Sequence, residues 1–335
     1  MKEIQFRANI TGTGKYLPEK ILTNEDIAKL IDTSDEWIQS RTGICERRIA
    51  QTGEASATMS TNAVLNLMEN YKLEAEEIDA IIVATITPDM MFPSTAALVQ
   101  KNLNAKNAWG YDLSAACSGF LFALQSGAAL ISSEQCKKVI VVGVDTMSSI
   151  LDFTDRNTCI LFGDGAGAVL LEPSEEYGIM DAELRIDGSG GEFLYMPAGG
   201  SLQPATVDTV NNRLHYVHQD GKIVFKKAVL EMVNISRKLA ERNNLTSNNI
   251  DLFIPHQANK RIINAAANKL ELEDSQVMIN IDRYANTTSA TLAICIAEAV
   301  EKKLVDKGDN VLLSTFGAGF SWGAMYIKWG ISAHA

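Results

Sequence analysis

Residues 109–130 read WGYDLSAACSGFLFALQSGAAL, and the organisation of the whole chain follows from this stretch. Its first residues are typical of a short strand that ends in small side chains. From Phe120 onward, apolar residues recur at the spacing of one helix face, through Leu124 and Ala128 to Ile131. Cys117 therefore lies where a strand gives way to a buried helix.

The position of Cys117 favours a chemical role. Unpaired N–H groups and the positive end of the helix dipole stabilise an anion, so a thiol at this terminus is expected to ionise more readily. Its small neighbours would leave room for a substrate to reach the sulfur: Ala115, Ala116, Ser118 and Gly119. The alternative is that Cys117 is one more small buried residue, which is the commonest fate of a free cysteine.

Composition limits the classes of protein to which the chain can belong. Its 335 residues are 46% hydrophobic and 21% charged, as in a globular protein with one large core or two ordinary ones. The net charge of −11 argues against nucleic-acid binding, because phosphate contacts need a basic face. Five cysteines without a CxxC pair suit free thiols in a reducing compartment. Residues 1–7 lack the apolar run of a signal peptide, and no segment has the length of a membrane span, so we expect a cytoplasmic protein without membrane contact.

The second half of the chain repeats the order of elements in the first. Runs correspond at an offset of about 170 residues: 78–84 with 250–256, 109–117 with 277–282 and the following Asn286, and 139–142 with 311–314. Asn286 stands near the position that matches Cys117, ahead of a helix of small residues. Further strands are expected at 159–162 and 166–171, and the passage 188–221 is expected to be an excursion on the surface.

Alternating strands and helices predict parallel sheets covered by helices. Two such halves packed as one body give an α/β fold of five layers, α/β/α/β/α, with residues 1–175 and 176–335 as the two halves. Equivalent strand ends then converge between the halves, which brings Cys117, His256 and Asn286 toward one place.

His256 and Asn286 are the polar residues best placed to act with Cys117. His256 follows an apolar run at the carboxyl edge, where parallel sheets bind their ligands, and Asn286 occupies the same edge one helix later. A histidine and an amide can together donate two hydrogen bonds to an enolate or an oxyanion. The remaining histidines lie in a polar segment, where we interpret them as structural or solvated, or in the tail: His215 and His218, and His334.

The sequence resembles β-ketoacyl-acyl carrier protein synthase III, a family of thiolase-like condensing enzymes that starts type II fatty acid synthesis. The resemblance covers nearly the whole chain and rests on motifs that are specific in combination. They are Ser34–Ile38, Arg41–Ile44, Phe92–Ser94, Asp112–Gly119, Phe162–Ala168, Pro255–Asn259, Asn286–Thr287 and Phe316–Gly323.

The resemblance implies a role for each matching residue. Cys117 would accept the acyl group, and His256 and Asn286 would bind a malonyl thioester and promote its decarboxylation. The N–H groups of Cys117 and of the 317–319 loop, at Ala318, would form the oxyanion hole. The adenine of coenzyme A would lie between Trp37 and Arg156. Its pantetheine arm would pass along Arg41, Thr42, Gly221, Phe225, Ala258 and Asn259. Phe316 would lie beside the cysteine, in the acyl pocket.

The resemblance also implies partners. Phe92 matches a residue that reaches into the acyl pocket of a second subunit, which implies a homodimer. The acyl carrier protein is acidic in this family, and a basic cluster could receive it: Lys222, Lys226, Lys227, Lys260 and Arg261. An ordinary solvated helix face is the alternative for any one of these residues. Acyl-CoA would be a substrate, and no metal or redox cofactor is required, because loss of CO2 itself generates the carbanion.

Two positions depart from the family pattern. Ala285 precedes the active-site asparagine where the family usually has glycine, and Gln219 stands where an apolar residue is common. Three other functions stay open: a condensing enzyme for a specialised lipid, quinolone or resorcinol, a Cys-His-Asn acyl hydrolase, and a scaffold without activity.

Overall fold

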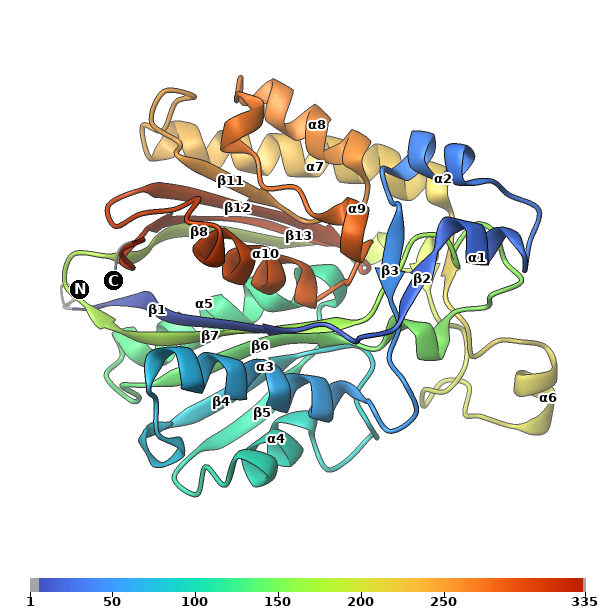
Figure 1. Ribbon diagram of the computed structural model, residues 1–335, viewed down its shortest axis with the longest axis horizontal. Coiled ribbons are helices and arrows are strands. Elements are labelled where there is room, and N and C mark those ends of the chain that lie inside the picture. Colours follow the sequence, from blue (N-terminus) through green and yellow to red (C-terminus); the bar gives the residue numbers. More distant parts are fainter. Residues whose placement is uncertain (1–5, 334–335) are drawn as a thin grey trace.

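Two sheets form the frame of the molecule, and the computed structural model describes them within residues 6–333 (Figure 1). The first sheet contains β1 (Arg7–Tyr16), β7 (Gly165–Ser174), β6 (Val139–Asp145), β4 (Ala80–Ala84) and β5 (Trp109–Leu113), in that order. The second contains β11 (Leu252–Pro255), β12 (Asn310–Gly317), β13 (Ser321–Lys328) and β8 (Gly178–Ile186). Residues 1–5 and His334, both named above, lie outside the described residues.

Helices form the other three layers (Figure 1). One outer layer holds α3 (Ser56–Tyr71) and α4 (Thr95–Leu103), and the other holds α7 (Gly221–Arg242) and α8 (Lys260–Lys269). The layer between the sheets holds α5 (Gly119–Ser132) and α10 (Ala290–Glu301). The predicted five-layered α/β fold is therefore confirmed. The smaller elements are β2 (Ile21–Thr23), α1 (Asn24–Ala28), α2 (Asp35–Thr42), β3 (Glu46–Arg48), β9 (Leu194–Tyr195), α6 (Val207–Asn211), β10 (His218–Gln219) and α9 (Ile281–Tyr284).

The strands pair in the same way in both sheets. β4 lies parallel to β6 and β5, as β11 lies parallel to β12 and, through one bridge from Phe253, to Val277. The next two pairings are antiparallel in both sheets. In the first sheet β6 pairs with β7 and β7 with β1, and in the second β12 pairs with β13 and β13 with β8. This matches the repeat seen in the sequence, although the strand predicted at 277–282 is reduced to the single bridge. The division after residue 175 stays a prediction.

The strand predicted at 159–162 is wrong. These residues form turns, and Phe162 alone makes a bridge, to Asn286 in the other half. The apolar run is buried because it packs against the second half of the chain, not because it joins a sheet. Strand β7 covers the neighbouring prediction at 166–171.

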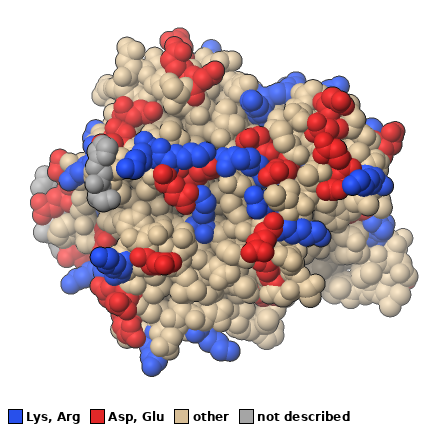
Figure 2. Space-filling model, viewed as in Figure 1, with Lys and Arg blue, Asp and Glu red and all other residues tan. Residues whose placement is uncertain are grey.

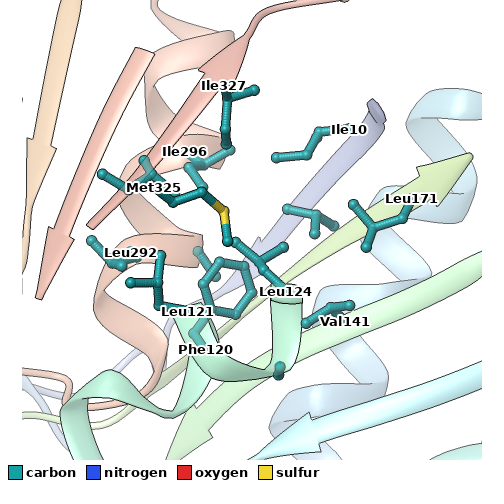
Figure 3. Close-up of a cluster of buried hydrophobic side chains, with 14 of the residues drawn as sticks. Ile10, Phe120, Leu121, Leu124, Val141, Leu171, Leu292, Ile296, Met325 and Ile327 are labelled. Carbon is teal, nitrogen blue, oxygen red and sulfur yellow. The ribbon is translucent and has the colours of Figure 1, made fainter. Parts of the chain in front are cut away.

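The largest core lies between the sheets, around α5 and α10 (Figure 3). Ten consecutive residues of α10, from Ala290 to Ala299, are buried, as expected of a helix enclosed on every side. Phe120 and Leu124 of α5 meet Ile296 of α10 and Met325 of β13 in this layer. Because α5 begins just after Cys117, the packing of this core also fixes the position of the cysteine.

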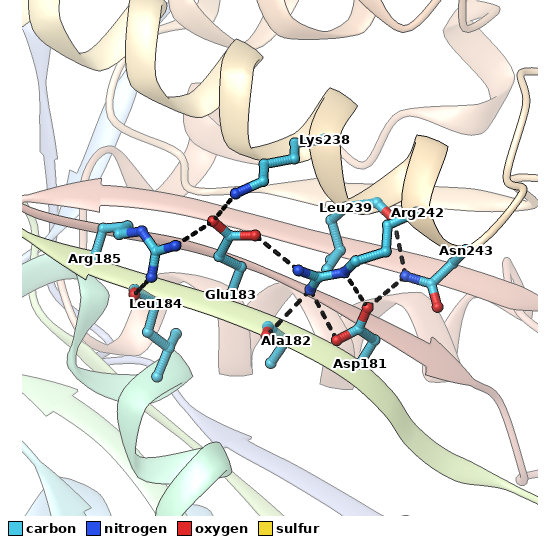
Figure 4. Close-up of polar contacts among 9 residues, drawn as sticks. All are labelled: Asp181, Ala182, Glu183, Leu184, Arg185, Lys238, Leu239, Arg242 and Asn243. Carbon is cyan, nitrogen blue, oxygen red and sulfur yellow. Dashed lines mark hydrogen bonds and ion pairs between the residues drawn. The ribbon is translucent and has the colours of Figure 1, made fainter.

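An ion network joins α7 to β8 on the outer side of the second sheet (Figure 4). The buried carboxylate of Glu183 accepts from Lys238, Arg242 and Arg185 at 2.6, 2.9 and 2.7 Å. Arg242 also holds Asp181 through two bonds, of 2.7 and 2.9 Å. The hydrogen bond from Lys238 is the main cause that lowers the pKa of Glu183.

We expect Glu183→Gln to lower the free energy of unfolding at pH 7 by about 1–2 kcal/mol. A carboxyl whose pKa is lowered on folding contributes stability above its unfolded pKa and loses it as the pH falls through the folded value. The difference between wild type and Glu183→Gln should therefore shrink between about pH 5 and pH 3, measured by urea unfolding. Glu241→Gln, which removes an exposed carboxylate 3.6 Å from Arg237, is the control and should change little. A difference that stays constant with pH would contradict this account.

The surface carries both signs of charge. Figure 2 shows acidic and basic side chains interspersed over one face, without a large region of a single sign. Among the described residues, none of the helices has the length and apolar character needed to cross a membrane.

Candidate active site

Cys117 lies in one turn of 3-10 helix (Ala116–Ser118) between β5 and α5, and it is buried. Ala116, before it, has a φ of +48°, in the left-handed region that favours glycine. Gly317 packs directly on the turn, since a Cβ added there would lie 2.8 Å from the Cys117 nitrogen. The predicted position between a strand and a helix is thus what the structure has.

Hydroxyl groups from the second half hold the turn in place. Ser321 donates to the Ala115 carbonyl at 3.1 Å, Ser289 to that of Ala116 at 3.0 Å, and Thr315 to that of Cys117 at 3.0 Å. In return, the hydroxyl of Ser118 donates to the Ser321 carbonyl at 3.0 Å. These bonds satisfy buried carbonyl groups in a strained turn, and they tie the cysteine to the half that carries the histidine and asparagine.

His256 follows β11 and is 1% exposed. Its backbone N–H donates to Ser314 at 2.8 Å, which extends the pairing with β12 by one residue. Within the described residues, neither ring nitrogen has a hydrogen-bond partner. Burial lowers the pKa of His256 to about 3, so the ring is neutral and can donate one N–H into the cavity that it lines.

Asn286 reaches the same cavity from the loop before α10. Its backbone is fixed by two bonds to the first half, from its N–H to Leu161 at 3.0 Å and from the Gly163 N–H to its carbonyl at 3.1 Å. The N–H of Thr288 donates to the side-chain oxygen at 2.9 Å. The amide oxygen is therefore occupied, and the NH2 group is the part left to act on a ligand.

The thiol of Cys117 is less acidic than its place at a helix start predicts. Burial, followed by the nearby charge of Asp145, raises its pKa to about 12. A hydrogen bond from its own N–H and one from Asn286 act in the opposite direction but are weaker. The expectation of a readily ionised thiol considered the helix terminus alone and omitted the cost of removing the sulfur from water.

An outer cavity of about 750 Å³ leads from the surface to the three residues. Cys117, His256 and Asn286 all line it, so the structure brings together the predicted trio. All eight residues predicted for coenzyme A line it as well: Trp37, Arg41, Thr42, Arg156, Gly221, Phe225, Ala258 and Asn259. Above the Trp37 ring, the guanidinium carbons of Arg156 and Arg41 lie 5.1 and 5.9 Å from its centroid.

An inner cavity of about 510 Å³ is also lined by Cys117. Its lining is mostly apolar and includes Ala318, Phe162 and Phe320. Phe316 lines the outer cavity and not the inner one, which differs from its predicted place in an acyl pocket. Phe92 is 84% exposed and lines neither cavity.

The passage 188–221 is more than a surface excursion. Leu194 and Tyr195 line both cavities, while His218 and Gln219 line the outer one. His218 is exposed, as expected of a solvated residue, but it also lines the outer cavity, because β10 pairs with the cavity-lining strand β9. The alternation of residues along this short polar segment does not indicate that it lines a cavity. The glycines around the segment indicate only that the backbone there is irregular.

The basic residues predicted to receive a carrier protein lie on α7 and α8, beside the outer cavity. Lys226, Lys260 and Arg261 are exposed, and Arg261 stacks 4.9 Å above the Phe225 ring. Lys227 is partly neutralised, since its amine lies 3.9 Å from Asp187 and 3.9 Å from Glu231. No group of three or more His, Cys, Asp and Glu side chains within residues 6–333 is arranged to hold a metal ion.

Ala285 sits in a backbone conformation that glycine adopts most easily. Its φ of +56° and ψ of −153° fall in a region nearly closed to residues with a Cβ. The departure from the family's glycine is therefore a source of strain beside Asn286.

We expect Ala285→Gly to raise the free energy of unfolding by about 1 kcal/mol, because relief of strain exceeds the added freedom of the unfolded chain. Thermal and urea unfolding would measure the gain. Ala299→Gly, inside helix α10, serves as the control and should lower stability by about 1 kcal/mol or more. Loss of stability in Ala285→Gly would contradict the assignment of strain.

Comparison with known proteins gives the class. The profile of 3-oxoacyl-[acyl-carrier-protein] synthase III matches residues 111–188, and that of its C-terminal part matches 240–329. The β-ketoacyl-[acyl-carrier-protein] synthase III of Chlorobaculum tepidum is 54% identical over 328 residues, which are 97% of this chain and 100% of that protein. Crystal structures of the synthase III from Aquifex aeolicus and Thermus thermophilus share 42% and 41% identity, with TM-scores of 0.89 and 0.90. Each alignment covers 96% of this chain, and 100% and 99% of those chains.

A duplicated five-layer fold, with a cysteine at the head of its central helix, defines a thiolase-like condensing acyltransferase. Within that class, the chain belongs to the β-ketoacyl-[acyl-carrier-protein] synthase III family.

Proposed function

We propose that this enzyme joins an acyl group from acyl-CoA to a malonyl group on acyl carrier protein, through an acyl-cysteine intermediate, and so initiates fatty acid synthesis. The observation that carries the proposal is the convergence of Cys117, His256 and Asn286 on one cavity, with Cys117 also lining a second cavity. A specialised-lipid condensing enzyme would use the same trio, but relatives about half identical over the full chain carry the primary synthase's name.

In the first half-reaction, the Cys117 sulfur attacks the thioester carbonyl of acyl-CoA. The N–H groups of Cys117 and of the 317–319 loop receive the developing oxyanion. The bond from the carbonyl carbon to the coenzyme A sulfur then breaks, and the proton lost by Cys117 ends on that sulfur. The acyl chain enters the inner cavity, whose apolar lining suits it.

In the second half-reaction, His256 and Asn286 each donate a hydrogen bond to the thioester oxygen of the malonyl group. The bond to CO2 breaks, and its electron pair passes into an enolate that these donors stabilise. The enolate carbon attacks the acyl carbonyl, and the Cys117 sulfur leaves as a thiolate that takes up a proton from water. A neutral His256 suits this role, because a hydrogen-bond donor is needed at the oxygen and no proton has to be transferred there.

The outer cavity is the proposed path for both thioesters. Trp37 and Arg156 at its mouth offer planar groups on which an adenine can stack. Lys226, Lys260 and Arg261 lie beside the mouth, where they would attract an acidic carrier protein. Lys227 contributes less to that attraction because carboxylates already face it.

The proposed homodimer is supported by the exposed Phe92 and its neighbour Met91, which is 82% exposed. Two such side chains together are costly to leave in water, and a second subunit would cover them. In this proposal Phe92 closes the partner's inner cavity. The expected location is the cytoplasm.

The decisive experiment follows both half-reactions by intact-mass spectrometry. The purified enzyme is exposed to a panel of acyl-CoAs and should gain one acyl group on Cys117. Malonyl-acyl carrier protein is then added, and the acyl group should leave the enzyme as a β-ketoacyl product. Release of free acid without condensation would favour a hydrolase, and turnover only with another acceptor would favour a specialised-lipid enzyme. Alkylation of Cys117 no faster than a free thiol, without acylation, would favour a scaffold.

A further inference from the structure

Asp145, at the end of β6, is a fully buried carboxylate surrounded by neutral donors. One oxygen accepts from the hydroxyls of Thr85 and Thr87 at 3.0 and 3.1 Å and from the Ile86 N–H at 2.8 Å. The other accepts from the Ser289 N–H at 3.0 Å and from the Thr288 hydroxyl. None of the ion pairs among the described residues includes it. A buried charge is costly, so its retention calls for a reason.

The two donors from the second half, Thr288 and Ser289, both act on the reacting groups. The Thr288 N–H orients the Asn286 amide through the 2.9 Å bond to its oxygen. The Ser289 hydroxyl donates to the carbonyl of Ala116, the residue before Cys117. Thr288 has a φ of +48°, a conformation that a β-branched residue keeps only when its surroundings enforce it. The carboxylate of Asp145 holds this segment in place by accepting hydrogen bonds from Thr288 and Ser289.

We propose that Asp145 is a positioning residue for condensation, which holds residues 286–289 so that the Asn286 NH2 group and the Cys117 sulfur address the same cavity. The inference rests on the proposed function of these two residues. It assigns the carboxylate an action through Thr288 and Ser289, without contact with substrate.

The charge of Asp145 gives an independent readout of this arrangement. Among the residues that the structure describes, it is the one charged group that contributes, after burial, to the raised pKa of the Cys117 thiol. The other polar side chains at the sulfur are neutral: Asn286 donates a hydrogen bond, and the pKa of His256 is lowered to about 3. Removal of the charge should therefore make the thiol more acidic.

The test compares Asp145→Asn with Asp79→Asn. Asparagine keeps the shape of the side chain, but in either orientation its NH2 group faces a backbone N–H, of Ile86 or of Ser289. Asp79 lies at the opposite end of the same sheet and accepts from the N–H groups of Lys137 and Lys138 at 2.7 and 2.9 Å. The Asp79→Asn variant therefore measures the effect on condensation of losing a carboxylate acceptor away from the site.

We expect Asp145→Asn to condense about 10- to 100-fold more slowly than Asp79→Asn per folded enzyme, as misplaced reacting groups do. The midpoint of the pH dependence of its alkylation by iodoacetamide should move to lower pH by roughly half a unit or more. The midpoint for Asp79→Asn should not move. Equal condensation by the two variants would overturn the proposal, whatever the alkylation profile. If circular dichroism shows that Asp145→Asn does not fold, Thr288→Val takes its place in the test. Condensation by Thr288→Val at the wild-type rate would likewise overturn the proposal. Failure of the proposed function would instead appear as a wild-type enzyme that forms no product. The alkylation measurement can still be made in that case, because it needs no substrate.

Discussion

Replacing Cys117 with alanine is expected to abolish the acyl-enzyme and to lower condensation by roughly 10³-fold or more. No other thiol can take its place. Cys136, Cys159 and Cys295 are buried and line neither cavity, and Cys45 is exposed outside both. Intact-mass spectrometry after exposure to acyl-CoA measures the effect directly, because each acyl group adds its own mass.

Cys45→Ala is the matched control, since it removes the exposed thiol and leaves the site unchanged. It should be acylated as wild type. The Cys117→Ala variant should also remain folded, because a small side chain replaces a small one in the 3-10 turn. An acylated Cys117→Ala protein would refute the assignment of the nucleophile, and the position of the modified residue would identify the true one.

The sequence was sufficient to predict the frame of the fold and the trio. Buried strands such as β4 and β6 are continuous apolar runs, and helices α5 and α10 carry small and apolar residues at helical spacing, so both signals are local. The duplicated order then placed Cys117 and Asn286 at equivalent strand ends. That inference needed no contact between the halves to be known.

What the sequence did not predict depends on contacts between segments that are not adjacent in the chain. The run 159–162 forms turns instead of a strand, and Phe162 at its end bridges to Asn286 in the second half. His218 lines the outer cavity because β10 pairs with β9, whose residues line both cavities. The acidity of Cys117 depends on burial and on Asp145, neither of which a helix terminus in the sequence reveals. Local patterns report element type, whereas these properties arise from packing between segments that are distant in the chain.

Replacing His256 or Asn286 with alanine is expected to separate the two half-reactions. In the proposed mechanism, acylation of Cys117 uses its own N–H and the 317–319 loop for the oxyanion, so each variant should retain acylation within about tenfold of wild type. Condensation needs both donors at the enolate oxygen, and loss of one should slow it by about 10²- to 10³-fold. The acyl-enzyme should then accumulate when malonyl-acyl carrier protein is added, which intact-mass spectrometry detects.

The structure gives this division a physical basis. The pKa of Cys117 is raised to about 12 and that of His256 is lowered to about 3, so both are neutral at physiological pH and no thiolate–imidazolium pair stores the proton. Because the proton of the thiol ends on coenzyme A, acylation needs no permanent base at His256. His218→Ala, at the mouth of the same cavity, is the control for a general loss of histidine and should affect both half-reactions alike. If His256→Ala instead lost acylation and condensation equally, His256 would have to accept the Cys117 proton, and the roles proposed for the two half-reactions would be wrong.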